Sequence, residues 1–174
     1  MEQKISTSVQ YQFTNNILFD EIFRGWENFK KHLDAGPDDM KKYLFQRWNE
    51  SNEMLKKNER LELKDVDKKV SVDDFNITFN KTQNGSSVFF FIFPDYAYRD
   101  AASKCVALAF TKNGPKYFTL EYSEHVSNHE PCWVIGEFYI DNGQKQHKNY
   151  GTVDNDRITY FAGKVLEILS GLGF

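Results

Sequence analysis

The chain has 174 residues, a net charge of −3 and 16% aromatic residues. Its hydrophobic content of 40% and charged content of 27% are ordinary for a globular protein and exclude global disorder. Its lysines and arginines form no basic run, and no apolar stretch reaches the about 18 residues of a membrane span. We therefore expect neither a nucleic-acid partner nor a membrane.

The first third of the chain predicts a strand followed by two helices. Residues 4–14 alternate between apolar and polar side chains, as in a half-buried strand. Residues 15–34 repeat apolar side chains at three- and four-residue spacing, which predicts an amphipathic helix. Gly36-Pro37 ends this helix, and a second helix is predicted over 37–57. The short link predicts that the two helices form an antiparallel pair.

Three Asn-Gly pairs then predict three successive β-hairpins. They begin at Asn84, Asn113 and Asn142, each between two runs of strand-forming residues. Both residues of such a pair tolerate the positive φ that tight hairpin turns need. In the first hairpin, a two-residue turn predicts that Phe79 lies opposite Phe90.

The second hairpin differs because Pro115 follows its Asn-Gly pair and has no backbone N–H to donate. The sequence therefore predicts a three-residue loop over 112–114, with Gly114 in the left-handed region. This register places Leu108 opposite Phe118.

The last elements are a polar strand and a helix. Residues 145–151 complete the third hairpin and carry lysines, which is typical of a protected sheet edge. Residues 155–170 repeat apolar side chains at helical spacing and predict a C-terminal helix. The prediction is a single α+β domain over 1–174, with a mainly antiparallel six- to seven-stranded sheet built of successive hairpins. The N-terminal helical pair and the C-terminal helix would pack on this sheet.

One short segment, residues 124–132, concentrates chemically active side chains. It holds His125, His129 and Cys132, and imidazole and thiolate are both zinc ligands. One candidate function is therefore a zinc-binding protein with these three ligands. Another is a thiol-dependent enzyme with Cys132 as nucleophile and His129 as its base. The plainer interpretation is a polar loop before a strand, because the spacing matches no zinc motif.

Two other segments carry the tyrosine, arginine and histidine side chains that are common at protein interfaces. The first contains Tyr96, Tyr98 and Arg99, and the second contains His147 and Tyr150. These five residues are predicted to bind a partner protein. The alternative is that the tyrosines only pack against the end of the sheet.

The sequence contains no catalytic triad, phosphate-binding loop or nucleotide fingerprint. It therefore favours a non-catalytic protein-binding module over an enzyme, and its size and charge fit an immunity- or inhibitor-type protein by analogy of class. A carrier of a small apolar ligand is the third candidate, if helices leave some of Phe89, Phe91 and Phe93 to line a groove. Two cysteines and no signal peptide predict a cytoplasmic protein.

Overall fold

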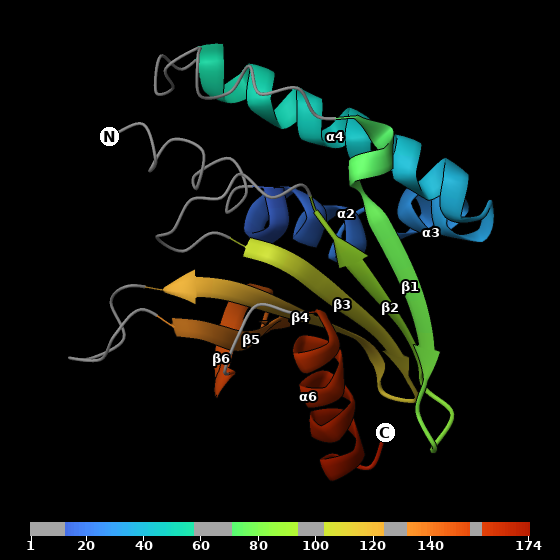
Figure 1. Ribbon diagram of the computed structural model, residues 1–174, viewed down its shortest axis with the longest axis vertical. Coiled ribbons are helices and arrows are strands. Elements are labelled where there is room, and N and C mark those ends of the chain that lie inside the picture. The colour runs from blue at the N-terminus through green and yellow to red at the C-terminus, as the bar shows by residue number, and fades with distance from the viewer. Residues whose placement is uncertain (1–12, 58–70, 94–102, 124–131, 154–157) are drawn as a thin grey trace. The chain divides into compact units, whose positions relative to one another are not determined.

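The protein has an α+β fold (Figure 1), and the fold class predicted from the sequence is confirmed. Its structure, a computed structural model, describes residues 13–57, 71–93, 103–123, 132–153 and 158–174. The strand predicted at residues 4–14 lies outside these segments except for its last two residues. Phe13 and Thr14 begin a π-helix instead, so the strand prediction is wrong at its end.

Two compact units divide the chain. The helical unit comprises residues 1–76 and 93–103, and the sheet unit comprises residues 77–92 and 104–174. The single domain predicted over 1–174 stays a prediction.

The helical unit contains one long helix and several short ones. They are the π-helix η1 (Phe13–Leu18), α2 (Phe19–Phe23), α3 (Trp26–Asp34), α4 (Pro37–Lys57) and the 3-10 helix η2 (Val72–Asp74). The predicted second helix is confirmed as α4. The predicted first helix is interrupted at Gly25, the residue before α3, because glycine costs about 1 kcal/mol in a helix interior relative to alanine.

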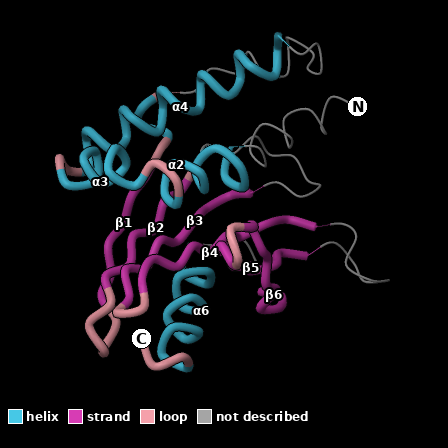
Figure 2. Tube along the Cα trace, turned by 180° about the vertical axis from the view of Figure 1, so that it is seen from behind, coloured by secondary structure: helices cyan, strands magenta, loops and turns pink. Residues whose placement is uncertain are grey.

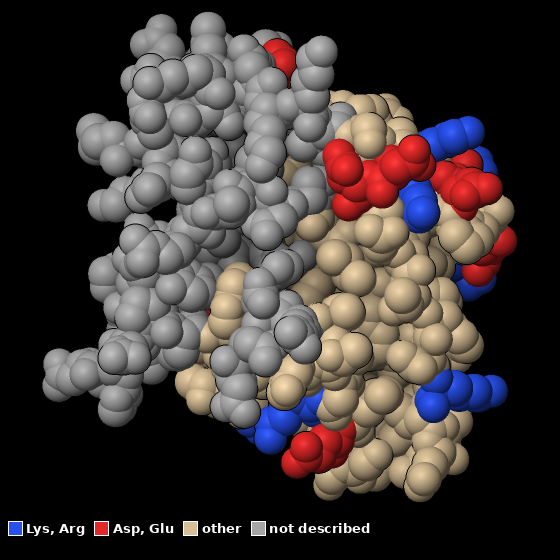
Figure 3. Space-filling model, in the orientation of Figure 1, with Lys and Arg blue, Asp and Glu red and all other residues tan. Residues whose placement is uncertain are grey.

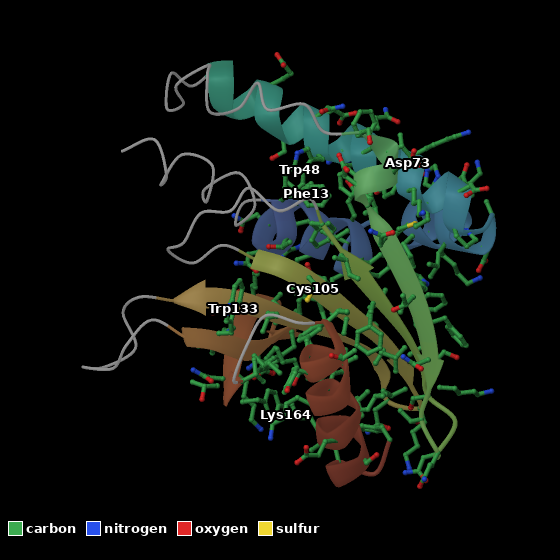
Figure 4. All side chains as sticks on the ribbon, in the orientation of Figure 1. Phe13, Trp48, Asp73, Cys105, Trp133 and Lys164 are labelled. Carbon is green, nitrogen blue, oxygen red and sulfur yellow. The ribbon has the colours of Figure 1, made fainter. Side chains whose placement is uncertain are left out.

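Aromatic rings form the core of the helical unit (Figure 4). The ring of Phe13 contacts those of Trp48 at 5.3 Å and Phe93 at 5.4 Å, and Trp48 contacts Phe75 at 5.8 Å. Phe91, in the sheet unit, is buried as well. Of the three phenylalanines of which some were expected along a groove, Phe89 is partly exposed and Phe91 and Phe93 are buried, and the apolar-ligand carrier stays a prediction.

The sheet unit is built on six strands in simple chain order (Figure 2), so each strand is followed by its antiparallel neighbour. The strands are β1 (Asn76–Lys81), β2 (Ser87–Ile92), β3 (Ser103–Thr111), β4 (Gly114–Ser123), β5 (Cys132–Asp141) and β6 (Gln144–Val153). β1 and β6 are therefore the two edges, and the predicted edge position of the lysine-bearing strand is confirmed.

Helix α6 (Ile158–Gly171) covers one face of this sheet. Phe161 contacts Phe90 at 6.0 Å between ring centres, and Val165 and Leu169 lie in the same buried cluster. Each fully buried side chain of this size stabilises the fold by about 1.5–3 kcal/mol. Cys105 is buried in the cluster, as expected for a cysteine that behaves as a small hydrophobe.

The first hairpin has a longer loop than predicted. The N–H of Thr82 donates to the carbonyl of Ser86 at 2.9 Å, which leaves three loop residues, and Gly85 takes the positive φ of 94°. Phe79 therefore lies opposite Phe89, with ring centres 5.1 Å apart, and the predicted pairing with Phe90 is wrong by one residue. Gly85 is therefore the third residue of a three-residue loop, whereas the sequence predicted it as the second residue of a two-residue turn.

The second hairpin confirms one prediction and corrects another. Gly114 has the predicted left-handed conformation, with φ of 101°. Phe118, however, lies in the cluster under α6, whereas Leu108 pairs with Phe89 on the opposite face. The predicted Leu108–Phe118 pairing is therefore wrong by one residue. The hydroxyl of Thr111 closes a tighter turn, because it donates to the carbonyl of Gly114 at 2.8 Å.

Candidate functional site

The candidate site is the outer side of β1, which pairs with β2 on its inner side. In an antiparallel pair, residues whose backbone groups bond to the neighbouring strand alternate with residues whose groups point away. Thr82 bonds to Ser86 across the turn. The N–H and C=O groups of Ile77, Phe79 and Lys81 therefore point away from β2, where a further strand would pair.

A row of three aromatic rings crosses the strands beside this edge. Phe79 contacts Phe89 at 5.1 Å, and Phe89 contacts Phe110 on β3 at 5.8 Å. The row lies on the face opposite α6, because Phe90, one residue along β2, is buried under that helix. Phe79 ends the row at the edge and is 55% exposed. A large exposed aromatic side chain at the edge of a sheet is typical of an interface anchor.

The strands of this region carry positive charge only. Lys81, Lys104 and Lys112 are the charged residues of segments 77–92 and 104–114, although the whole chain has more acidic than basic residues. In Figure 3 red acidic groups and blue basic groups lie side by side over the helical unit, whereas the surface over β1 is largely uncharged. An edge of this kind attracts negative charge.

A small hollow lies between the turns of the first two hairpins and the last two residues of the chain, Gly173 and Phe174. Asn84, Ser86, Phe110, Lys112 and Phe174 are among the residues that line it, and its volume is about 290 Å³. The Ser86 hydroxyl donates to the carbonyl of Phe174 at 2.9 Å, which fixes one wall.

The opposite edge, β6, holds two of the predicted partner-binding residues. His147 lies against Gly136 and contacts the Phe138 ring at 4.6 Å. Tyr150 lies on the α6 side of the sheet, where it contacts Phe118 at 5.8 Å. His147 and Tyr150 thus point to opposite faces and do not form one surface. Their role in partner binding stays a prediction.

Tyr150 takes part in a polar contact inside the sheet unit. Its hydroxyl donates to Glu137 Oε1 at 2.8 Å, and Lys116 Nζ lies 3.7 Å from Glu137 Oε2. Glu137 is buried, so the hydroxyl and the ammonium group stabilise a carboxylate that has lost most of its water. Burial, followed by the Glu137 carboxylate, raises the pKa of Tyr150 above its usual value. The tyrosine therefore acts as a permanent hydrogen-bond donor.

The helical unit has a polar network of its own. The Tyr43 hydroxyl donates to Glu21 Oε2 at 2.6 Å, and Arg47 lies 2.9 Å from Glu21 Oε1. His32 stacks on Tyr43 at 4.2 Å, and its Nδ1 lies 2.8 Å from Asp39 Oδ2. Burial and the bond to Glu21 raise the pKa of Tyr43. These side chains use their hydrogen bonds on one another, which ties α2 and α3 to α4.

Most of the other predicted site residues fall outside the described segments: His125, His129, Tyr96, Tyr98 and Arg99. Cys132 begins β5, and its side chain is not described. In the described part of the chain, no three His, Cys, Asp or Glu side chains are grouped so that they could hold a metal ion. The zinc, thiol and Tyr96–Arg99 hypotheses stay predictions.

The β1 edge was missed from the sequence because of the register of the first hairpin. A shift by one residue moves every side chain of a strand to the other face, so Phe79 lies opposite the partly exposed Phe89 and not opposite the buried Phe90. Two signals were available. A glycine can serve the third position of a three-residue loop, and segments 77–92 and 104–114 have no acidic residue.

Comparison with known protein families, curated proteins and solved structures gave no match for this chain. Among the helices that the structure describes, none has the length and apolar character to cross a membrane. The functional argument therefore rests on the geometry of the sheet edge.

Proposed function

We propose that this protein is a non-catalytic binding module that recognises an extended segment of another protein by strand addition to β1. The observation that carries the proposal is the coincidence of two features at one residue. Phe79 has backbone groups that point away from β2, and its side chain is largely exposed beside the aromatic row.

In strand addition, the main chain and the side chains of the edge strand contribute differently to binding. Main-chain hydrogen bonds to the edge strand give affinity, and contacts to alternate side chains give specificity. The backbone of Ile77, Phe79 and Lys81 supplies the first, and the rings of Phe79 and Phe89 supply the second. A large exposed aromatic side chain on an edge strand also promotes unwanted pairing, so Phe79 at this position needs a function to explain it.

The test is selection of binders from a displayed library of random peptides long enough to pair with all of β1. Peptides selected on the full chain are expected to lose about 30-fold in affinity for Phe79→Ser, because removing an interface anchor costs about 2 kcal/mol or more. Tyr160→Ser is the matched control. Tyr160 is 47% exposed but lies on α6.

A pair of proline variants separates the edge from the strand itself. Ile77→Pro removes an N–H that points away from β2, so it is expected to prevent peptide binding while the sheet stays folded. Thr78→Pro removes an N–H that bonds to β2, so it is expected to destabilise the hairpin. Circular dichroism and peptide binding measure the two effects.

Two results would overturn the proposal. Selected peptides that bind Phe79→Ser and Ile77→Pro as well as the original chain would show that binding occurs elsewhere. Sedimentation that shows a dimer of this chain, lost in Phe79→Ser, would show that β1 pairs with a second copy rather than with another protein.

A further inference from the structure

We infer that the segment bound at β1 alternates between apolar and uncharged polar side chains, with aromatic or β-branched residues in the apolar series. This inference rests on the proposed strand addition and adds the chemical pattern of the partner. It follows from the different side chains that β1 presents on its two faces, because the side chains of a paired segment alternate in step with those of the edge strand.

One face of β1 is apolar in its middle. Ile77 and Phe79 lie on this face two residues apart, and Phe79 is 55% exposed whereas Ile77 is half-buried. The ring of Phe89 lies 5.1 Å from that of Phe79 and extends the apolar face onto β2. Apolar side chains of a bound segment would cover the Phe79 ring and remove its exposed area from water. An aromatic or β-branched side chain paired with an aromatic one across two strands raises a binding constant by up to about fivefold.

The other face of β1 is polar. Thr78 and Asn80 point to it, because side chains of a strand alternate, and both are exposed. Hydroxyl and amide side chains of a bound segment can form hydrogen bonds with Thr78 and Asn80 across the strands. An apolar side chain there would remove water from these groups and return no hydrogen bond. The second series of the segment is therefore polar.

The charge of β1 lies at its end. Lys81 is the last residue of the strand and its one charged residue. A charged side chain opposite residues 77–80 would lose hydration and meet no opposite charge on β1. A basic side chain opposite Lys81 is disfavoured by repulsion between like charges. Charge complementarity therefore requires a segment that is uncharged in its middle, with negative charge only at the end beside Lys81.

The first experiment compares two orders of the same residues. Peptides selected on the full chain from the random library are expected to show the alternation. One selected peptide is then compared, by titration calorimetry, with a peptide of the same composition whose apolar residues are grouped at one end. The grouped peptide is expected to bind about tenfold more weakly, because some of its apolar side chains must face Thr78 and Asn80 in every register.

Two lysine variants then assign each series to its face, by repeating the selection on each variant. Phe79→Lys is expected to select an acidic residue two positions from an apolar one, in the series that was apolar. Thr78→Lys is expected to select an acidic residue directly beside an apolar one, because opposite charges pair across strands. Tyr160→Lys is the control for net charge, since Tyr160 is 47% exposed on α6. Circular dichroism checks that each variant is folded.

The outcomes separate this inference from the proposed function. Peptides that depend on Phe79 but bind equally well in the grouped order would overturn the alternation and leave strand addition intact. Acidic residues at the same positions in all three lysine variants would show a response to net charge, which overturns the assignment of the two faces. Peptides that do not depend on Phe79 would overturn both the inference and the proposed function.

Discussion

β6 carries lysines and other polar side chains along its length, whereas β1 leaves an aromatic ring exposed in its middle. On β6, Lys145 lies over the ring of Phe138 at 4.9 Å and Lys148 lies over the ring of Tyr150 at 5.0 Å. The register of β6 with β5 also shifts between Val134 and Gly136. Lysines and register shifts are the usual means by which proteins prevent pairing at sheet edges.

The difference shows that unwanted strand pairing is favoured at β1 over β6. β1 lies at the other edge of the same sheet, and its Phe79 is 55% exposed beside Phe89. The β6 edge, called the protected edge below, therefore carries two lysines along its length, whereas β1 has a lysine only at its last residue, Lys81, and exposes Phe79 in its middle. Selection for stability alone would favour protection at both edges, so the open edge is the place to look for function.

The largest effect is expected from the buried cluster under α6. Phe161→Ala removes the ring that packs on Phe90 under α6, and such substitutions destabilise by about 3–5 kcal/mol. Urea unfolding followed by circular dichroism measures the loss, with Tyr160→Ala on the exposed side of α6 as control. A loss below about 1 kcal/mol would show that α6 does not hold the sheet face in the way the buried cluster indicates.

A smaller loss is expected when the protected edge loses its inner hydrogen bond. Tyr150→Phe leaves the buried Glu137 carboxylate with Lys116 as its remaining partner, which costs about 1–3 kcal/mol. The free energy of unfolding in urea is the measurement, and Tyr160→Phe on α6 is the control. If Tyr150→Phe matches the control, the hydroxyl contributes nothing to β6.

The same contact predicts how stability depends on pH. Tyr150 has a pKa raised above its usual value of about 10, so the folded state keeps a proton that the unfolded state loses at high pH. This contribution is complete below pH about 10 and is lost as the pH rises toward the folded-state value. Tyr43 and Tyr117 also have raised pKa values.

Stability is therefore expected to fall as the pH rises above about 10, and to fall less steeply in Tyr150→Phe than in the original chain. Urea unfolding at several pH values measures both slopes. Equal slopes would mean that Tyr150 has the same pKa in the folded and unfolded states. The hydrogen bond from Tyr150 to Glu137 would then not stabilise the folded state at high pH.

Helix α4 and the three hairpins were predictable from the sequence because their signals are local. The bounds of α4 follow from the spacing of apolar residues such as Met40, Leu44 and Trp48, all of which are buried. The hairpins follow from the Asn-Gly pairs. Each of these patterns involves residues that are close together in the sequence, so it can be recognised without knowledge of the tertiary packing.

The registers and the site were not predictable in the same way. Two- and three-residue loops can contain the same Asn-Gly pair, and in both hairpins a threonine two residues before the asparagine bonds to the turn, so the local sequence does not decide between the two loop lengths. One residue of register places Phe79 opposite Phe89 rather than Phe90, on the face away from α6. His147 and Tyr150, by contrast, are an odd number of residues apart on β6, so the alternation of a strand alone predicts that they point to opposite faces, as the structure shows.

The smallest effect is expected at Gly136, where the protected edge packs most closely. A Cβ added there would overlap the ring of His147, so Gly136→Ala must push the imidazole away from Phe138. Because the obstacle is the end of an exposed side chain, the cost is expected to be about 1 kcal/mol, at the lower end for overpacking.

The double variant with His147→Ala sharpens this prediction. Without the imidazole, the added methyl group has room, so Gly136→Ala should cost little in the His147→Ala background, and a double-mutant cycle gives the coupling between the two residues. Equal costs in both backgrounds would place the obstacle in the backbone of β5 and β6. In that case the close packing of His147 would not contribute to the protection of this edge.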